Sequence, residues 1–256
     1  MGRLQKIFDQ KKTGVLNVYF TAGYPTVDST VKLMKTLQDE GVDIIELGMP
    51  YSDPLADGPV IQESSSIALK NGMSIAMLFS QLKDFRINIH TPVILMGYMN
   101  PVLQYGFEKF CKEAAAVGID GLILPDLPPF EFESKYGKII KDCGLDFIFL
   151  VTPETSVERV KLLDSLSSGF LYAVSSSSTT GNEKNMNDVV EYVDRLKSYH
   201  VKNPIMVGFG IKDKTTFDML NGHAHGGIIG SAFIKALDSS NDYSSSASSF
   251  IRSILK

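Results

Sequence analysis

The stretch VDSTVKLMKTLQDEGVDIIELGMP, residues 27–50, joins a helix pattern directly to a strand pattern. Val31, Met34 and Leu37 recur at helical spacing, which predicts an amphipathic helix over 27–40. Gly41 is suited to the end of this helix, and the apolar run 42–47 predicts a buried strand immediately after it. A helix followed at once by a mostly apolar strand is typical of α/β proteins.

The same alternation continues along the rest of the chain. Apolar, β-branched runs predict eight strands, at 16–21, 42–47, 92–96, 121–124, 146–151, 170–174, 204–208 and 226–229. Helical patterns lie near 27–40, 60–70, 74–86, 106–117, 130–143, 155–167, 186–200, 213–221 and 245–255. Strand–helix alternation implies parallel strands with right-handed crossovers. We therefore predict a single (β/α)8 TIM-barrel domain over residues 1–256 with extra short helices; an open, doubly wound sheet is the alternative.

Composition excludes several classes of protein. The formal net charge is −4 and there is no long basic run, so nucleic acid is not expected as the main partner. No apolar run approaches the roughly 20 residues that span a membrane, and the start MGRLQKIFDQ lacks the apolar segment of a signal peptide. The two cysteines, Cys111 and Cys143, fall in predicted helices and are expected to be reduced thiols. A cytoplasmic protein is the resulting expectation.

Two carboxylates are the main candidates for chemistry, because barrel enzymes place catalytic groups at the C-terminal ends of strands. Glu46 interrupts an apolar strand, where burial raises the pKa of a carboxyl and suits it to give and take a proton. A structural salt bridge is the alternative. Asp57 lies in the following loop, YSDPLADGP, and is placed to reach back over the barrel mouth. Asp53 of the same loop is the better candidate for an ordinary turn cap.

Other catalytic chemistries lack suitable residues. No lysine falls at a predicted strand end, so a Schiff-base nucleophile is not expected. All the histidines precede strands, on the opposite face of a barrel: His90, His200, His223 and His225. We therefore predict no metal site and carboxylate acid–base catalysis without a cofactor in this chain.

Glycines follow the last three predicted strands, at Thr180-Gly181, Gly208-Phe209-Gly210 and Gly230-Ser231. Glycine lets backbone N–H groups approach a phosphate, and barrels often build phosphate sites after their last strands with a short extra helix. Ser231 is expected to open that helix and donate its hydroxyl. Side chains expected to form an apolar pocket beside the phosphate are Phe20, Tyr98, Tyr172 and Phe209. The serine-rich run 175–178 opens on the same face; a flexible surface loop is the alternative.

Several motifs resemble the tryptophan synthase α-subunit family over nearly the whole chain. The most specific is IIELGMPYSDPLADGPVIQESSSIAL, residues 44–69. The others are FTAGYP (20–25), MGYMNP (96–101), GLILPDLPPFE (121–131), STTG (178–181), VGFGI (207–211) and GSAF (230–233). Ser176 and Ser178 stand where many members carry a basic residue and a glycine before their VTG segment, so the rate at which this loop closes is not inferred.

The resemblance implies retro-aldol cleavage of indole-3-glycerol phosphate to indole and glyceraldehyde 3-phosphate, with Glu46 and Asp57 as catalytic residues. It implies substrate-binding positions at Phe20, Ile61, Tyr98, Tyr172, Thr180, Gly181, Phe209, Gly210, Gly230 and Ser231. It also implies loop coupling through Asp53 and Asp126 to a β subunit, which holds pyridoxal phosphate, receives the indole and forms an α2β2 heterotetramer. Two alternatives stay open: another phosphate-binding barrel lyase or isomerase, and a binding module that only activates the β subunit.

Overall fold

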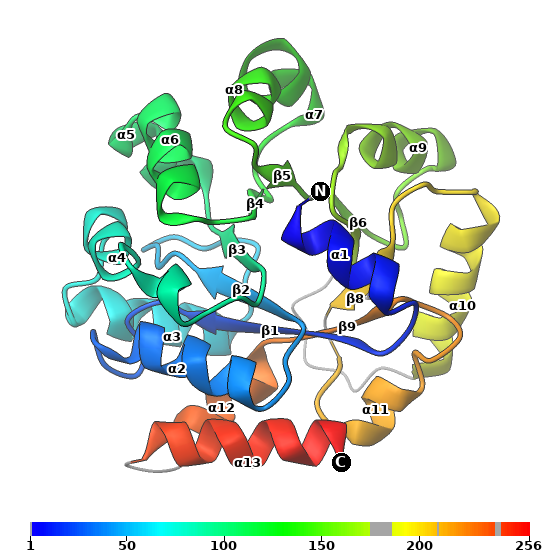
Figure 1. Cartoon of the computed structure of the whole chain (residues 1–256). Coiled ribbons are helices and arrows are strands. Elements are labelled where there is room, and N and C mark those ends of the chain that lie inside the picture. Colours follow the sequence, from blue (N-terminus) through cyan, green and yellow to red (C-terminus); the bar gives the residue numbers. More distant parts are fainter. Residues whose placement is uncertain (1, 175–185, 209, 239–241) are drawn as a thin grey trace.

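The computed structural model describes residues 2–174, 186–208, 210–238 and 242–256, and its strands form one curled sheet surrounded by helices (Figure 1). Every strand pairing in these ranges is parallel, in the order β5-β4-β3-β2-β1-β9-β8-β7-β6. The strands are β1 Val15–Thr21, β2 Ile44–Gly48, β3 Val93–Met96, β4 Gly121–Ile123, β5 Asp146–Phe147, β6 Leu150–Val151, β7 Leu171–Val174, β8 Ile205–Gly208 and β9 Gly226–Ile229.

The predicted fifth strand, 146–151, is divided into β5 and β6, and this division closes the barrel. β5 pairs with β4, while β6 pairs with β7 at the other end of the sheet. The two residues between them continue both ladders. The Ile148 N–H donates to the Leu122 carbonyl at 3.0 Å, and the Phe149 carbonyl accepts from the Tyr172 N–H at 3.1 Å. One short run therefore joins the two ends of the sheet, and the predicted barrel is confirmed against the open-sheet alternative.

The helices lie outside the strands, as expected for a parallel barrel (Figure 1). Six predicted helices occur close to their expected bounds: α2 Ser29–Asp39, α3 Pro59–Lys70, α6 Phe107–Val117, α9 Val157–Leu166, α10 Met186–Ser198 and α13 Tyr243–Leu255. The prediction over 213–221 is shortened to α11 Lys214–Asp218. The short extra helix expected at Ser231 is α12, Ser231–Asp238.

Two predicted helices are interrupted and two others were not predicted. The pattern at 74–86 forms α4 Ile75–Gln81 and the 3₁₀ turn η1 Phe85–Ile87. The pattern at 130–143 forms α7 Pro129–Glu131, the π-helical turn η2 Phe132–Tyr136 and α8 Gly137–Asp142. The unpredicted helices are α1 Arg3–Gln10 and α5 Met99–Tyr105. Both have fewer than nine residues, too few for a clear periodic signal.

Helix α1 covers the N-terminal end of the barrel. Phe8 is buried and packs against Phe170 and His225, with ring centroids 6.1 Å apart in each case. Arg3 donates to the Asp120 carboxylate at 2.9 Å. Phe170, His225 and Asp120 each directly precede a strand, so α1 packs where strands begin. The opposite face, at the C-terminal ends of the strands, remains for the functional site.

Gly226 permits the close approach of β1 and β9. A Cβ atom at this position would lie 1.9 Å from the Val15 carbonyl oxygen, a backbone atom held in the sheet. We expect Gly226→Ala to lower the free energy of unfolding by about 3 kcal/mol, because the two strands must separate. Urea titration measures this. In Gly58→Ala, where a Cβ meets no described atom within 4 Å, the loss should stay below about 1 kcal/mol. Equal stability of the two variants would contradict the close approach.

Candidate active site

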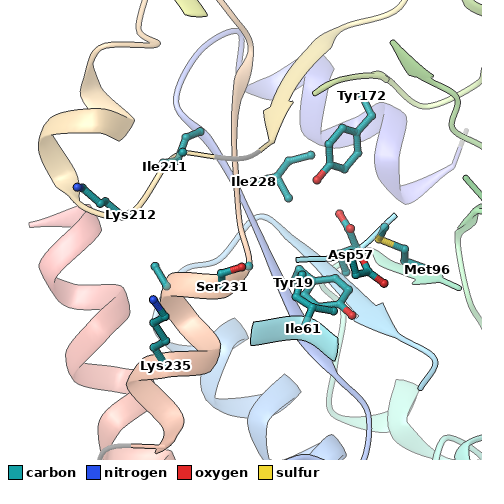
Figure 2. A pocket seen from close by; sticks show the side chains of 14 residues that line it. Tyr19, Asp57, Ile61, Met96, Tyr172, Ile211, Lys212, Ile228, Ser231 and Lys235 are labelled. Carbon is teal, nitrogen blue, oxygen red and sulfur yellow. The ribbon is translucent and has the colours of Figure 1, made fainter. Parts of the chain in front are cut away.

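A cavity of about 350 Å³ lies at the C-terminal ends of the strands (Figure 2). Its walls come from β1, β2, β3, β7 and β9, from the loops after β2 and β8, and from the first turns of α3 and α12. The lining residues are Tyr19, Glu46, Asp57, Ile61, Met96, Tyr172, Gly210, Ile211, Lys212, Ile228, Gly230, Ser231, Ala232 and Lys235. Both predicted carboxylates therefore face one cavity.

Glu46 is fully buried in β2, opposite Tyr19 of β1 in the strand register. Its Oε2 accepts a hydrogen bond from the Asn17 Nδ2 at 2.8 Å, and its Oε1 has no partner among the described residues. Burial raises the pKa of Glu46 to about 8, against the opposing effect of the Asn17 bond; the negative charge of Asp57 adds a smaller upward contribution. The carboxyl can therefore be protonated at neutral pH, as acid catalysis requires. Glu46 forms no salt bridge with any of the described residues, so the alternative of a structural salt bridge is not supported there.

Asp57 reaches back from the loop after β2 and is only 5% exposed. The Tyr98 hydroxyl donates to its Oδ2 at 2.9 Å, and the same hydroxyl accepts from the Ala56 N–H at 3.0 Å. Burial raises the pKa of Asp57 to about 6, while the Tyr98 bond lowers it. Near pH 7 the two carboxyls therefore differ: Asp57 is mainly ionised and Glu46 mainly protonated.

Two tyrosines stand beside these carboxyls, and Figure 2 shows Tyr19 and Tyr172 with Asp57 at one end of the cavity. Burial, and then the neighbouring carboxylates, raise the pKa of both phenols well above the usual value, so both stay neutral. Gly48 and Gly208 make room for them. A Cβ on Gly48 would lie 2.2 Å from the Tyr19 hydroxyl oxygen, and one on Gly208 would lie 2.3 Å from that of Tyr172. The tyrosines thus form neutral aromatic walls with polar tips.

The other end of the cavity suits an anion. Gly230 and Ser231 form the start of α12, and Lys235 follows Ser231 by one helical turn (Figure 2). Gly210 and Lys212 approach from the loop after β8. A helix N-terminus, a hydroxyl and two ammonium groups are the donors with which proteins bind phosphate. The cavity therefore combines buried acid groups at one end with anion-binding groups at the other.

Five of the predicted substrate-binding residues line this cavity, and one prediction was wrong. These lining residues are Ile61, Tyr172, Gly210, Gly230 and Ser231. Tyr98 is not in the lining but donates a hydrogen bond to Asp57, which is. Phe20 does not line the cavity.

Phe20 is fully buried on the outer side of β1, where it packs against Phe233 of α12 with ring centroids 6.3 Å apart. Alternate residues of a strand face opposite sides, so the inward residue is Tyr19. Thr180, Gly181 and Phe209, together with the serine-rich run 175–178, lie outside the described residues.

The two aspartates expected to couple loops lie in the loops after β2 and β4. Asp53 is exposed, and its carboxylate accepts from the adjacent Ser52 hydroxyl. Asp126 accepts the Met99 N–H with both carboxylate oxygens, each at 3.0 Å. It thereby links the loop after β4 to the first residue of α5.

The sequence prediction did not name several residues at the cavity. The polar ones are Asn17, Tyr19, Lys212 and Lys235, and the apolar ones are Met96, Ile211, Ile228 and Ala232. The strand LNVYFT contained a usable signal, because Asn17, Tyr19 and Thr21 are polar or amphipathic and share one face at a period of two. Lys235 was also recognisable, since it follows Ser231 by four residues in a helix that was predicted. Lys212 lies in a loop, where no periodicity indicates its direction.

Cys111 and Cys143 are both free thiols, and Cys111 is buried. Within the described ranges, no group of three or more His, Cys, Asp or Glu side chains is arranged to hold a metal ion. In the same ranges, every helix is too short or too polar to cross a membrane.

Comparisons with known proteins agree with the geometry. The family model described as "Tryptophan synthase alpha chain" matches residues 5–253. The tryptophan synthase alpha chain of Parabacteroides distasonis is 48% identical over 240 residues, which is 93% of each chain. That of Karelsulcia muelleri is 48% identical over 256 residues, covering 100% of both chains. The crystal structure of tryptophan synthase subunit alpha from Legionella pneumophila has a TM-score of 0.90 at 34% identity, covering 99% of this chain and 97% of that chain. The chain belongs to the tryptophan synthase alpha chain family.

Proposed function

We propose that Glu46 and Asp57 are the catalytic residues with which this chain cleaves indole-3-glycerol phosphate into indole and glyceraldehyde 3-phosphate. The observation that carries the proposal is the pairing of two buried carboxyls of different pKa with an anion-binding cluster across the same cavity. A substrate with a phosphate at one end and an indole at the other matches that arrangement. Family membership supports the same carbon–carbon lyase reaction.

The substrate is placed by its two ends. Its phosphate lies against Gly210, Gly230 and Ser231, with Lys212 and Lys235 supplying positive charge. Its indole lies among the apolar and aromatic walls of the other end: Tyr19, Ile61, Met96, Tyr172 and Ile228. Thr180, Gly181 and Phe209 are assigned to substrate binding by their positions in the family motifs alone.

The reaction is a proton relay through one carboxyl. Protonated Glu46 gives its proton to indole C3 and becomes a carboxylate. The carboxylate then takes the proton of the glycerol hydroxyl next to the bond that breaks. The electron pair of that C–C bond returns to the ring, which restores indole, and the hydroxyl-bearing carbon becomes the aldehyde. Asp57 accepts a hydrogen bond from the indole N–H and stabilises the positive charge that develops while C3 is protonated. Glu46 ends in its starting state.

This relay predicts a bell-shaped pH dependence of kcat/KM for indole release. Activity should rise through about pH 6 as Asp57 ionises, and fall through about pH 8 as Glu46 loses the proton that it must donate. The measurement is the initial rate of indole formation at subsaturating substrate between pH 5 and pH 9.5. A rate that keeps rising above pH 8.5 would contradict protonated Glu46 as the starting form.

We also propose a tryptophan synthase β subunit as the partner, in an α2β2 heterotetramer that receives the indole. Pyridoxal phosphate is assigned to that subunit, and no cofactor to this chain. Leu55, in the loop after β2, and Phe130, in the short helix α7 after β4, are 89% and 77% exposed on the cavity side of the barrel. Exposed apolar side chains are suited to a protein interface. Asp53 and Asp126 flank them in sequence and are assigned to coupling between the subunits.

The test is indole release by the purified chain, alone and with a β subunit. Slow release by the chain alone and a rate at least 10-fold higher with the β subunit are expected, because loop closure around Asp57 depends on the partner. Stimulation without any intrinsic release would support the activator alternative instead. Absence of release and of substrate binding under both conditions would refute the proposed function.

Two further assignments complete the proposal. Residues 1–256 act as one domain with the active site at the C-terminal face of the strands; a single hydrophobic core and a single sheet support this. The cytoplasm is the proposed location, since the thiols of Cys111 and Cys143 are both free, as in a reducing compartment.

A further inference from the structure

Asn17 is a buried amide that the proposed reaction does not use directly. It lies in β1, fully buried, two residues before Tyr19 on the inner face of the barrel. Its register partners are Ile44 of β2 and Ile228 of β9, so its neighbours across the sheet are apolar. A polar side chain among apolar neighbours carries a desolvation cost, which a specific hydrogen bond can offset.

That hydrogen bond is made to the catalytic candidate. The Asn17 Nδ2 donates to the Glu46 Oε2 at 2.8 Å, and no other described residue bonds to the Glu46 carboxyl. The Asn17 amide therefore holds Oε2, and Oε1 is left to contact a reacting atom. We propose that Asn17 is a positioning residue for the lyase reaction, which holds Glu46 by Oε2 and thereby presents Oε1 to the substrate. This inference rests on the proposed function and assigns the group that prepares Glu46 for its role.

The same bond also sets the acidity of Glu46. A donor to a carboxylate stabilises the ionised form, so the Asn17 bond lowers the pKa of Glu46 against the larger effect of burial. The other titratable groups that interact with Glu46 are Asp57, whose negative charge raises the Glu46 pKa, and the neutral phenols of Tyr19 and Tyr172. Without the amide, Glu46 would hold its proton more tightly and would be a weaker acid toward indole C3. Positioning and proton affinity thus depend on one contact.

Asn17→Leu tests the inference, since leucine has a similar volume and no donor. We expect kcat for indole release to fall about 10-fold with KM changed less than threefold, because a hydrogen bond to a charged group is lost while the phosphate site is intact. The alkaline limb of the pH profile should move upward by about 1 pH unit. Asn17→Val, a strong strand former, gives the same two readouts if the leucine variant folds poorly.

The matched control is Asn203→Leu. Asn203 also donates from Nδ2 to a buried carboxylate, Asp164 Oδ1 at 2.9 Å, but it lies outside the cavity lining, before β8. This variant should lose stability and keep the wild-type pH profile. If kcat falls in the Asn17 variants but the alkaline limb of the pH profile does not move, Asn17 has a merely structural role and the inference is overturned. Wild-type values of kcat and of the alkaline limb would also overturn it.

An infrared titration separates this inference from the proposed function. The C=O stretch of protonated Glu46, identified by its absence in Glu46→Gln, should disappear with a midpoint about 1 pH unit higher in Asn17→Leu than in wild type. This readout needs no turnover. If the wild-type chain releases no indole, the lyase assignment fails; the infrared midpoints then still decide whether Asn17 controls Glu46, and equal midpoints would refute that control.

Discussion

Glu46→Gln is expected to lower kcat for indole release about 10³-fold, because the amide can neither donate a proton to indole C3 nor accept one from the glycerol hydroxyl. KM should change little, since the phosphate-binding end of the cavity is untouched. Single-turnover and steady-state indole formation measure the loss. Glu113→Gln, which alters a glutamate of α6 that bonds to Tyr105 outside the cavity lining, should retain wild-type turnover. Full activity of Glu46→Gln would refute its catalytic role.

The same substitution should change how stability depends on pH. The pKa of Glu46 rises from its ordinary value of 4.5 to about 8 on folding, so the folded protein holds a proton that the unfolded chain releases between these values. Stability of the wild type therefore falls as pH rises through this window. Between pH 5 and pH 8, Glu46→Gln should lose about 3 kcal/mol less than the wild type in urea titrations. Parallel loss in both proteins would show that Glu46 is not buried as an acid.

Asp57→Asn is expected to lower kcat about 10²-fold. The amide keeps the shape of the side chain and can accept the Tyr98 hydroxyl bond, but it has no negative charge to stabilise the protonated indole ring. The acid limb of the pH profile, assigned to ionisation of Asp57, should disappear together with the rate. Initial rates between pH 5 and pH 7 provide both readouts.

Two companion variants define the origin of that loss. Tyr98→Phe retains the carboxylate and removes one donor to it, so the fall in kcat should be about 10-fold and the acid limb should move to higher pH. Asp39→Asn, in an exposed ion pair of α2 with Lys35, should behave as wild type. An acid limb that persists in Asp57→Asn would assign that limb to another group.

The barrel was predictable because its signals are local. Helical spacing in 27–40 and apolar runs such as 42–47 identify elements from a few neighbouring residues, and their alternation implies parallel strands. The interrupted helices show the limit of this approach. The pattern over 130–143 is continuous in hydrophobicity, but the backbone passes through a π-helical turn at Phe132–Tyr136. Hydrophobic period alone does not distinguish these helix types.

The site was predictable only in part. Glu46 stands out because a carboxylate in an apolar strand is unusual, and Asp57 because it lies in the loop that follows this strand, within the most specific family motif. Phe20 was chosen in place of Tyr19 because the direction of a strand residue depends on which face of the strand is turned inward. A shift of one residue exchanges the two faces.

Local sequence patterns were enough to predict the order and type of most elements, the two carboxylates and the glycine-rich ends of the last strands. These properties depend on residues within about one helical turn or one strand of each other. Three features depend on the closed barrel: the register that sets Tyr19 opposite Glu46, the hydrogen bond from Asn17, and the burial that separates the two carboxyl pKa values. The reason is physical: desolvation and hydrogen bonding act between side chains that approach only when the barrel closes, and sequence distance carries no information about that approach.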